Sequence, residues 1–260
     1  MITSTANTRI KDLITLHKRS RRDAEGLFLI EGVSEIQIAA GSAVDFTAVY
    51  YCPDLASAQT EKMVAALSCE CIHVSRRVFE KIAYRGGTGG IVAVARQRSS
   101  KLADICLSDT PLILVAEGIE KPGNIGAMLR TAEAAGADAV IICGCATDLY
   151  NPNVIRSSLG ALFGVAAVAC TPDEAIGFLQ AKGVPFVAAV PGADTVYTQA
   201  DLSGPAALVV GSEATGLSSR WRDACRVQVH IPMCGKVNSL NASVSAALLL
   251  YEAVRQRRRS

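Results

Sequence analysis

The stretch IPMCGKVNSLNASVSAALLLYEAV, residues 231–254, carries the strongest signal for fold and function in this chain. A short apolar run at 227–231 leads to Pro232, and a polar loop then enters a helix that begins polar and turns apolar. The helix start holds more amides and hydroxyls than one cap requires, namely Asn238, Ser239, Asn241, Ser243 and Ser245. Polar side chains and free backbone N–H groups at a helix N-terminus suit a polar ligand. A well-capped helix on a core is the alternative.

Two other stretches have the same organisation, LILVAEGIEKPGNIGAMLR at residues 112–130 and ALVVGSEATGL at residues 207–217. Each is an apolar run that ends in a glycine-containing polar turn, and a helix is expected after each turn. In open α/β sheets, ligands bind at the carboxyl ends of the strands. Three such strand ends in one half of the chain therefore favour a ligand site there.

Together the three stretches resemble the three motifs of the SpoU/TrmH family of RNA 2′-O-ribose methyltransferases, within the SPOUT superfamily, in order and in spacing. The matching residues are Asn124, Gly126 and Arg130 in the first stretch, Gly211, Ser212 and Glu213 in the second, and Ile231, Pro232, Ser239, Leu240, Asn241 and Ser243 in the third. The resemblance covers residues 110–255 well. It is looser upstream, where the layout around FLIEG (28–32) looks like the substrate-binding domain of many SpoU relatives, similar to RNA-binding ribosomal proteins.

The hydropathy pattern predicts an α/β fold in both halves of the chain. Downstream, strands are expected at 112–116, 138–142, 165–169, 185–190, 206–210 and 227–231, and helices at 124–135, 153–158, 172–182, 217–224 and 240–257. This alternation predicts a mostly parallel sheet with helices on both faces. The resemblance implies that its C-terminal part is threaded into a deep trefoil knot that forms the cofactor site.

Upstream, the same pattern predicts a small α/β domain. Its expected strands are 27–30, 46–51, 71–74 and 91–95, and its expected helices are 9–17, 33–40, 56–67 and 76–83. The polar stretch RQRSSKLADICLSDTP, residues 96–111, predicts a domain boundary. We therefore expect an RNA-binding domain at 1–100, a linker at 101–110 and a knotted methyltransferase domain at 111–260.

Sequence patterns limit the possible cellular location of the protein and the cofactors that it could bind. No apolar run is long enough to span a bilayer, and the N-terminus lacks a signal-peptide pattern, so a cytoplasmic protein without a membrane partner is expected. The nine cysteines form no CxxC pair and the three histidines lie far apart. This spacing argues against a metal site and predicts reduced, buried thiols. The dinucleotide fingerprint GxGxxG is absent after the first strand of the C-terminal half.

Basic residues are concentrated in the first half of the chain. Residues 1–101 carry 14 Lys and Arg against 10 Asp and Glu, whereas residues 102–260 carry 12 against 14. Basic clusters of this kind indicate nucleic acid, and a solvated surface is the alternative. The glycine-rich loop 85–90, RGGTGG, allows close approach to a phosphate or is simply flexible. The candidate RNA-binding residues are Arg9, Arg19, Arg21, Arg22, Arg85 and Arg156.

The resemblance implies methyl transfer from S-adenosylmethionine to a ribose 2′-hydroxyl, without a metal. Arg130 matches the family's catalytic arginine, which is proposed there to activate the hydroxyl. A guanidinium is a poor base, so we favour a role in stabilising the developing alkoxide and gripping the adjacent phosphate. A surface ion pair with Glu133 or Asp138 is the alternative.

Four further catalytic candidates follow from the motif match. Asn124 is expected to shape the active site, or else to cap a helix. Glu213 is expected to position Asn124 or an arginine, or else to be a favourable charge at a helix start. Ser239 and Asn241 are expected to bind substrate and complete the site.

The resemblance also implies that the knot loops contact the cofactor through their backbone. By position, these contacts are Val190, Pro191, Gly192, Gly211, Ser212, Glu213, Ile231, Pro232, Met233 and Leu240. Family members act as homodimers with active sites near the subunit interface, so a homodimer is expected here.

The N-terminal domain favours large-subunit (23S) rRNA over tRNA as the substrate, because minimal tRNA-acting relatives often lack this domain. A tRNA ribose methyltransferase is the alternative enzyme, and a role in antibiotic resistance stays open. An inactive RNA-binding or ribosome-assembly protein on the same fold is the hypothesis from another class.

Overall fold

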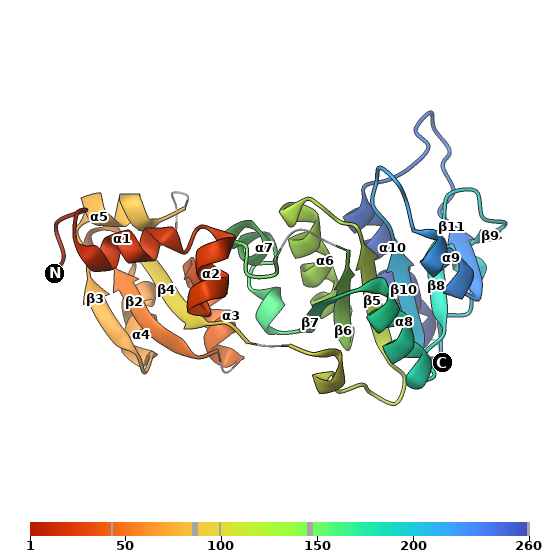
Figure 1. Ribbon diagram of the computed structural model, residues 1–260, viewed down its shortest axis with the longest axis horizontal. Helices are drawn as coiled ribbons and strands as arrows, with labels where there is room; N and C mark the ends of the chain where they lie inside the picture. The colour runs from red at the N-terminus through yellow and green to blue at the C-terminus, as the bar shows by residue number, and fades with distance from the viewer. Residues whose placement is uncertain (43, 85–87, 99, 145–147, 259–260) are drawn as a thin grey trace. The chain divides into compact units, whose positions relative to one another are not determined.

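A computed structural model of the chain describes residues 1–42, 44–84, 88–98, 100–144 and 148–258 (Figure 1). The chain forms two compact units, and each is α/β. The first unit comprises Met1–Ser99 and Tyr150–Gly164, and the second comprises Ser100–Leu149 and Val165–Ser260. Among the helices of the described ranges, none has the length and apolar character that a membrane span requires.

The first unit is built on a four-stranded sheet in the order β1-β4-β2-β3. The strands are β1 (Leu27–Glu31), β2 (Phe46–Tyr51), β3 (Glu70–His73) and β4 (Ile91–Arg96). Strand β4 runs antiparallel to both β1 and β2, and β2 and β3 are parallel. The helices are α1 (Thr8–Thr15), α2 (Arg19–Glu25), α3 (Val33–Gly41), α4 (Ala58–Ala66), α5 (Arg76–Ile82) and α7 (Pro152–Ser157).

Helix α2 is the element of this unit that hydropathy does not predict. Its sequence, RSRRDAE, has no apolar stripe, so its position depends on a charged residue instead. Arg22 is only 1% exposed, and its guanidinium donates to the carbonyls of Leu16 (2.8 Å) and His17 (2.9 Å) just after α1. Arg22 therefore joins α1 to α2, which is a structural role rather than the predicted RNA contact.

Residues 150–164 belong to the first unit, although the predicted boundaries assign them to the C-terminal domain. Helix α7 packs against β1. The ring of Phe28 in β1 lies 4.4 Å from the ring of Tyr150 and 5.9 Å from that of Phe163, centroid to centroid. Aromatic burial on β1 thus holds this segment there.

The second unit contains a seven-stranded sheet in the order β7-β6-β5-β10-β8-β11-β9. The strands are β5 (Leu112–Glu117), β6 (Ala139–Cys143), β7 (Ala166–Cys170), β8 (Phe186–Ala189), β9 (Thr195–Val196), β10 (Ala206–Val210) and β11 (Val227–His230). Every pairing is parallel. The predicted parallel sheet is therefore confirmed, and only the two-residue strand β9 was not expected. The knot that the resemblance implies is not tested by strand order and stays a prediction.

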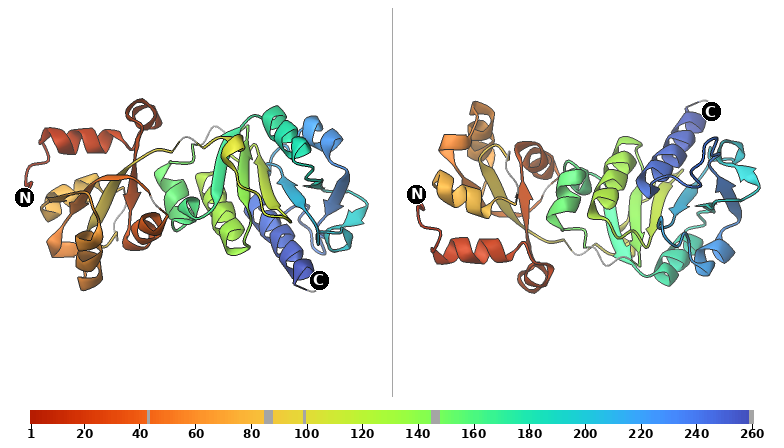
Figure 2. Two further views of the ribbon diagram at one scale, coloured as in Figure 1. Left: turned by 90° about the horizontal axis from the view of Figure 1, so that it is seen from below. Right: turned by 90° about the horizontal axis from the view of Figure 1, so that it is seen from above.

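Helices cover both faces of this sheet, as the alternating pattern predicts. Helices α6 (Pro122–Ala134) and α10 (Ala242–Arg257) pack together on one face, and α8 (Pro172–Ala181) and α9 (Ser219–Ala224) on the other (Figure 2). Strands β5, β6 and β10 are buried at every position. They are therefore uniformly apolar apart from Glu117 at the end of β5, as expected for strands covered on both sides.

The cysteines agree only in part with the expectation of buried thiols. Cys52, Cys143 and Cys225 are buried, whereas Cys71, Cys106 and Cys234 are exposed. Burial raises the pKa of Cys225 to about 12, so this thiol stays protonated at neutral pH.

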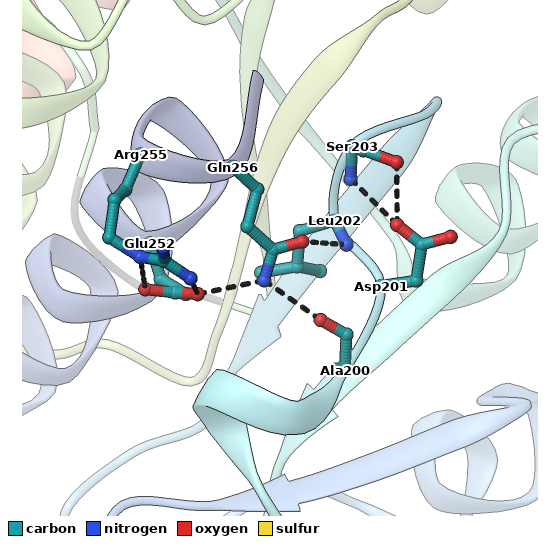
Figure 3. Close-up of polar contacts among 7 residues, drawn as sticks. All are labelled: Ala200, Asp201, Leu202, Ser203, Glu252, Arg255 and Gln256. Atoms are coloured by element: carbon teal, nitrogen blue, oxygen red, sulfur yellow. Dashed lines mark hydrogen bonds and ion pairs between the residues drawn. The ribbon is translucent and has the colours of Figure 1, made fainter. Parts of the chain in front are cut away.

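The C-terminal helix is fastened by a buried carboxylate and an amide (Figure 3). Glu252 is 6% exposed and accepts from Arg255 (2.6 and 2.8 Å) and from Gln256 Nε2 (2.7 Å). The Gln256 amide also donates to the Ala200 carbonyl (2.9 Å) and accepts from the Leu202 N–H (2.8 Å). One side chain thus satisfies two backbone groups of the segment that precedes β10.

We expect Gln256→Ala to lower the free energy of unfolding by about 1–3 kcal/mol, because the two backbone groups lose their partner. Urea unfolding followed by the fluorescence of Trp221, the chain's single tryptophan and part of the second unit, measures this loss. The matched control is Gln180→Ala on α8, since that side chain is exposed and has no hydrogen bond to the described residues. Equal losses in the two variants would contradict the assigned role.

Candidate functional site

The three motif stretches meet at one edge of the second unit's sheet. Strand β10 lies between β5 and β8, and β11 pairs with β8 on the other side. Because all these strands are parallel, their carboxyl ends reach the same edge. The loops after β5, β10 and β11 therefore converge there, as the sequence predicts.

Three predicted catalytic residues form a hydrogen-bonded cluster at this edge. Asn124, in the first turn of α6, donates through Nδ2 to Glu213 Oε1 (2.7 Å). Asn241, the N-cap of α10, donates through Nδ2 to the same Glu213 oxygen (2.9 Å) and to Asn124 Oδ1 (3.1 Å). The carboxylate thereby sets the orientation of both amides. The contact between Glu213 and Asn124 that the sequence prediction requires is present.

Asn241 serves the helix as well as the cluster. Its Oδ1 accepts from the N–H (3.0 Å) and the hydroxyl (2.6 Å) of Ser243, which caps α10. The N–H of Ala242 approaches Glu213 Oε1 at 3.4 Å. The capping and polar-site interpretations of this segment therefore both apply, because one residue fulfils the two roles.

Arg130 and Ser239 stand apart from this cluster. Arg130 lies six residues beyond Asn124 on α6, so the two side chains point about 120° apart around the helix axis. The Arg130 guanidinium is exposed and has no hydrogen bond or ion pair with any described residue. Its suggested partner Asp138 instead accepts from the N–H groups of Ser108 (2.7 Å) and Leu112 (2.8 Å). Arg130 is thus free to contact a ligand.

A cavity of about 640 Å³ opens beside the cluster. The loops after β8, β10 and β11 and the first turn of α10 line it, and this volume lies within the range of small-molecule sites. The predicted cofactor residues that line it are Val190, Pro191, Gly192, Gly211, Ser212, Glu213, Ile231, Met233 and Leu240. Pro232 does not line it, whereas Ser239 does.

Asn238 and Ser245, which the sequence singles out as polar groups suited to a ligand, also line the cavity. The sequence prediction missed three other lining residues, Thr215, Arg222 and His230. Arg222 is on α9 and His230 ends β11, just before the third motif. Neither residue belongs to a motif, and only the folding of α9 against β8 brings Arg222 to this side.

The loop after β10 is a tight turn that depends on a glycine. A Cβ at Gly211 would collide with the Gly216 carbonyl group and lie 2.5 Å from the Leu217 nitrogen. Within the turn, the Ser212 hydroxyl accepts from the Thr215 N–H (3.1 Å), and the Gly216 N–H donates to the Ser212 carbonyl (3.0 Å). The cavity wall is therefore a closed backbone loop, which suits recognition through backbone groups.

A buried carboxylate holds the far end of the same loop. Glu117, the last residue of β5, is 9% exposed and accepts from the N–H and the hydroxyl of Ser218, both at 2.7 Å. Glu213 holds the near end of the loop to Asn124 and Asn241. Sequence reasoning did not single out Glu117, although an acidic residue that ends a buried strand is a signal for such a contact.

The predicted RNA-binding arginines of the first unit differ in whether their guanidinium groups are available to contact RNA. Arg9, Arg19 and Arg21 form exposed ion pairs with Glu70 (2.7 Å), Asp23 (3.4 Å) and Glu25 (2.9 Å). Such surface pairs are weak and exchange readily with another anion. Arg22 is buried, as described above, and Arg85 lies outside the described residues.

Arg156, on α7, is exposed and unpaired among the residues that the structure describes. Among all residues that the structure describes, no group of three or more His, Cys, Asp or Glu side chains could hold a metal ion.

Two family models match the chain. The SpoU rRNA Methylase family matches residues 111–251, and the MRM3-like substrate binding domain matches residues 7–93. The chain is 32% identical over 250 residues to the 23S rRNA (uridine(2479)-2'-O)-methyltransferase of Streptomyces viridochromogenes. This alignment covers 93% of the chain and 87% of the relative.

Solved structures match over nearly the whole chain. A structure described as an RNA 2'-O ribose methyltransferase is 43% identical with a TM-score of 0.89, and the match covers 99% of each chain. The SpoU methyltransferase AviRb from Streptomyces viridochromogenes, in complex with the cofactor AdoMet, is 31% identical with a TM-score of 0.91. That match covers 97% of this chain and 98% of the other.

We expect Glu117→Gln to raise the Kd for S-adenosylmethionine about tenfold, because the loop loses a charge-assisted hydrogen bond at its far end. Titration of Trp221 fluorescence, one turn beyond Ser218, measures binding. Ser218→Ala should have the same effect, and the double variant no further effect, because the two residues act as one pair. The control is Glu133→Gln, an exposed acid on α6. Additive effects of the two single variants would rule out the pair.

Proposed function

This chain belongs to the SpoU rRNA methylase family, and we propose that it methylates a ribose 2′-hydroxyl of large-subunit rRNA with S-adenosylmethionine as the methyl donor. The observation that carries the proposal is the cluster of Asn124, Glu213 and Asn241 beside the cavity formed by the loops. The Streptomyces viridochromogenes relative, named for 23S rRNA, supports the substrate, and the AdoMet-bound AviRb structure supports the cofactor.

The residues that line the cavity suit the charge of the cofactor. S-adenosylmethionine, when bound, supplies a methyl group on a positively charged sulfonium. Val190, Val210, Leu217, Ile231 and Leu240 give the cavity apolar walls. Such walls do not stabilise a positive charge, so they favour a transition state in which this charge is being lost.

Arg130 acts on the substrate side of the reaction. Its guanidinium has no partner among the described residues, so its five donors remain available for RNA oxygens. It binds the phosphate next to the target ribose and stabilises the developing alkoxide of the 2′-hydroxyl. Asn124 and Asn241 are held in fixed orientations by Glu213, so the ribose meets a preorganised polar surface.

The first unit binds the RNA. Support comes from the match of residues 7–93 to a substrate-binding domain and from the guanidinium of Arg156, which has no partner among the described residues. The exposed arginines Arg9, Arg19 and Arg21 add charge that attracts a polyanion. A relative named for 23S rRNA that aligns along 93% of the chain supports rRNA over tRNA. The proposed rRNA substrate supports a cytoplasmic location, which stays a prediction.

We expect Arg130→Ala to lower kcat about 10²- to 10³-fold, the usual cost of losing one donor to a developing oxyanion. The assay is transfer of labelled methyl from S-adenosylmethionine to unmodified 23S rRNA and, separately, to tRNA, with the modified ribose mapped by reverse-transcriptase stops. The control is Arg226→Ala, an exposed arginine outside the cavity and the cluster.

Label in tRNA alone would overturn the substrate. Full activity in Arg130→Ala would overturn its catalytic role. Cofactor binding without transfer to either RNA would favour a binding protein over an enzyme.

We also propose that the chain acts as a homodimer through α10. Val244 and Tyr251 are 45% and 50% exposed and lie seven residues apart, so they share one face of the helix. Exposed apolar side chains on a helix that also carries Asn241 would place a partner subunit next to the site.

We expect Tyr251→Glu to convert a dimer to a monomer, because a carboxylate would be buried without a partner in the interface. Light scattering after size-exclusion chromatography gives the mass, and thermal unfolding shows whether the fold persists. The control is Arg258→Glu at the C-cap of the same helix. A wild-type protein that is monomeric at micromolar concentration would disprove this assembly.

A further inference from the structure

The first unit contains a second cavity, of about 260 Å³, that none of the predicted catalytic or cofactor residues reaches. The end of β1, the start of α3, the residues on either side of the undescribed segment 85–87, and α7 line it. This volume is too small for a whole cofactor and suits a fragment such as a single base.

Glu35 makes this cavity unusual. It is 8% exposed, yet its carboxylate has no hydrogen bond or ion pair with any described residue. The two other buried carboxylates among the described residues, Glu117 and Glu252, are both fully engaged. The Glu35 oxygens are not among the fully buried polar atoms without a partner, so they open onto the cavity, where the donors of a ligand can reach them. A carboxylate on a buried residue that has no partner among the described residues marks a candidate binding group.

The surrounding backbone makes room for the Glu35 carboxylate. Gly32 has φ +105°, and a Cβ there would collide with a carboxylate oxygen of Glu35. Gly160 has φ +85°, and its Cβ would lie 3.2 Å from the Cα of Glu35. Two glycines in conformations that side chains rarely adopt thus surround one acidic residue.

Thr88 also contributes to the lining, but its hydroxyl is fully buried, so a ligand in the cavity does not reach it. The cavity therefore offers the Glu35 carboxylate, which accepts two parallel hydrogen bonds. Glu31, also in the lining, is already engaged, since it accepts from the Tyr84 N–H (2.8 Å).

The hydrogen-bonding groups in the cavity favour some parts of an RNA chain over others. Two carboxylates in the lining repel a phosphate, whereas base N–H groups are neutral donors. Guanine alone among the four bases presents two adjacent donors, N1–H and the N2 amine, beside an acceptor, O6. Adenine and cytosine each present one amine donor beside acceptors, and uracil presents a single N–H between two acceptors.

Besides hydrogen bonds to the edge of a base, a base-binding site needs a surface for stacking and a contact for the phosphate. Tyr84 and Arg156 supply these two features. Tyr84 is about half exposed, and its hydroxyl accepts from Asn153 Nδ2 (3.4 Å), which restrains a ring on which a base can stack. Arg156 is exposed and has no partner in the described part of the chain, so it is available for the phosphate that flanks the base.

We propose that this cavity binds one unpaired guanine of the RNA substrate, with the Glu35 carboxylate accepting from N1–H and from the N2 amine. This inference rests on the proposed RNA substrate. It makes the first unit a reader of base identity, whereas the cluster of Asn124, Glu213 and Asn241 acts on a ribose.

The test uses the full-length protein and fluorescein-labelled 11-nucleotide probes in which ten uridines flank one central guanosine, inosine, adenosine or uridine. Fluorescence anisotropy at fixed salt gives each Kd. We expect the guanosine probe to bind about tenfold more tightly than the inosine probe, which lacks the N2 amine. Glu35→Gln should abolish this ratio, because an amide presents a donor to a donor.

Two further variants keep the result interpretable. Arg156→Ala should weaken all four probes equally and leave the guanosine-to-inosine ratio intact, since it contacts phosphate. Asp54→Asn, an exposed acid of the same unit, is the charge control for Glu35→Gln. Circular dichroism and the Kd for S-adenosylmethionine should be unchanged in every variant.

Equal binding of the guanosine and inosine probes to wild type would overturn the proposal, and so would a ratio that survives Glu35→Gln. These outcomes are separate from the proposed activity. Methyl transfer to rRNA can succeed while guanine recognition fails, and binding alone reports the latter.

Discussion

The position of β10 between β5 and β8 is the constraint on which the rest of the second unit depends. Parallel pairing on both sides brings the loops after β5, β10 and β11 to one edge, although their sequences are far apart. Glu213 then joins Asn124 to Asn241 across a separation of 117 residues. Without this strand order the carboxylate would have neither partner, and the cavity beside it would lose a wall.

Buried carboxylates show how one chemical group serves three purposes in this chain. Glu252 ties the C-terminal helix together through Arg255 and Gln256, and Glu117 holds the end of the cavity loop through Ser218. Both are satisfied by the protein, so they contribute to the fold. Glu35, on a similarly buried residue, has no partner among the described residues, and this difference marks it as a binding group.

The arginines also fall into two groups, those that bind protein groups and those that are available to a ligand. Arg22 and Arg257 donate to backbone carbonyls, those of Leu16 and His17 for the first and of Thr110 and Gly204 for the second. Their charge therefore serves structure. Arg130 and Arg156 are exposed and have no partner among the described residues, so their donors are available to RNA. Composition reveals that basic residues are abundant, but only their surroundings distinguish a structural guanidinium from a binding one.

The sequence by itself determined the elements that depend on local pattern. Apolar runs predict the buried strands of the parallel sheet, and the motif residues identify Asn124, Glu213 and Asn241 before any geometry is known. Hydropathy failed at α2, because its position depends on the buried Arg22 rather than on an apolar stripe.

Which distant residues become hydrogen-bond partners was decided by the tertiary structure alone. It showed that Glu117 holds Ser218, and that Arg130 and Glu35 have no hydrogen-bond or ion-pair partner among the described residues. Hydrophobic periodicity and helix capping act within a few residues, whereas a hydrogen bond between distant residues depends on the path of the chain through the sheet.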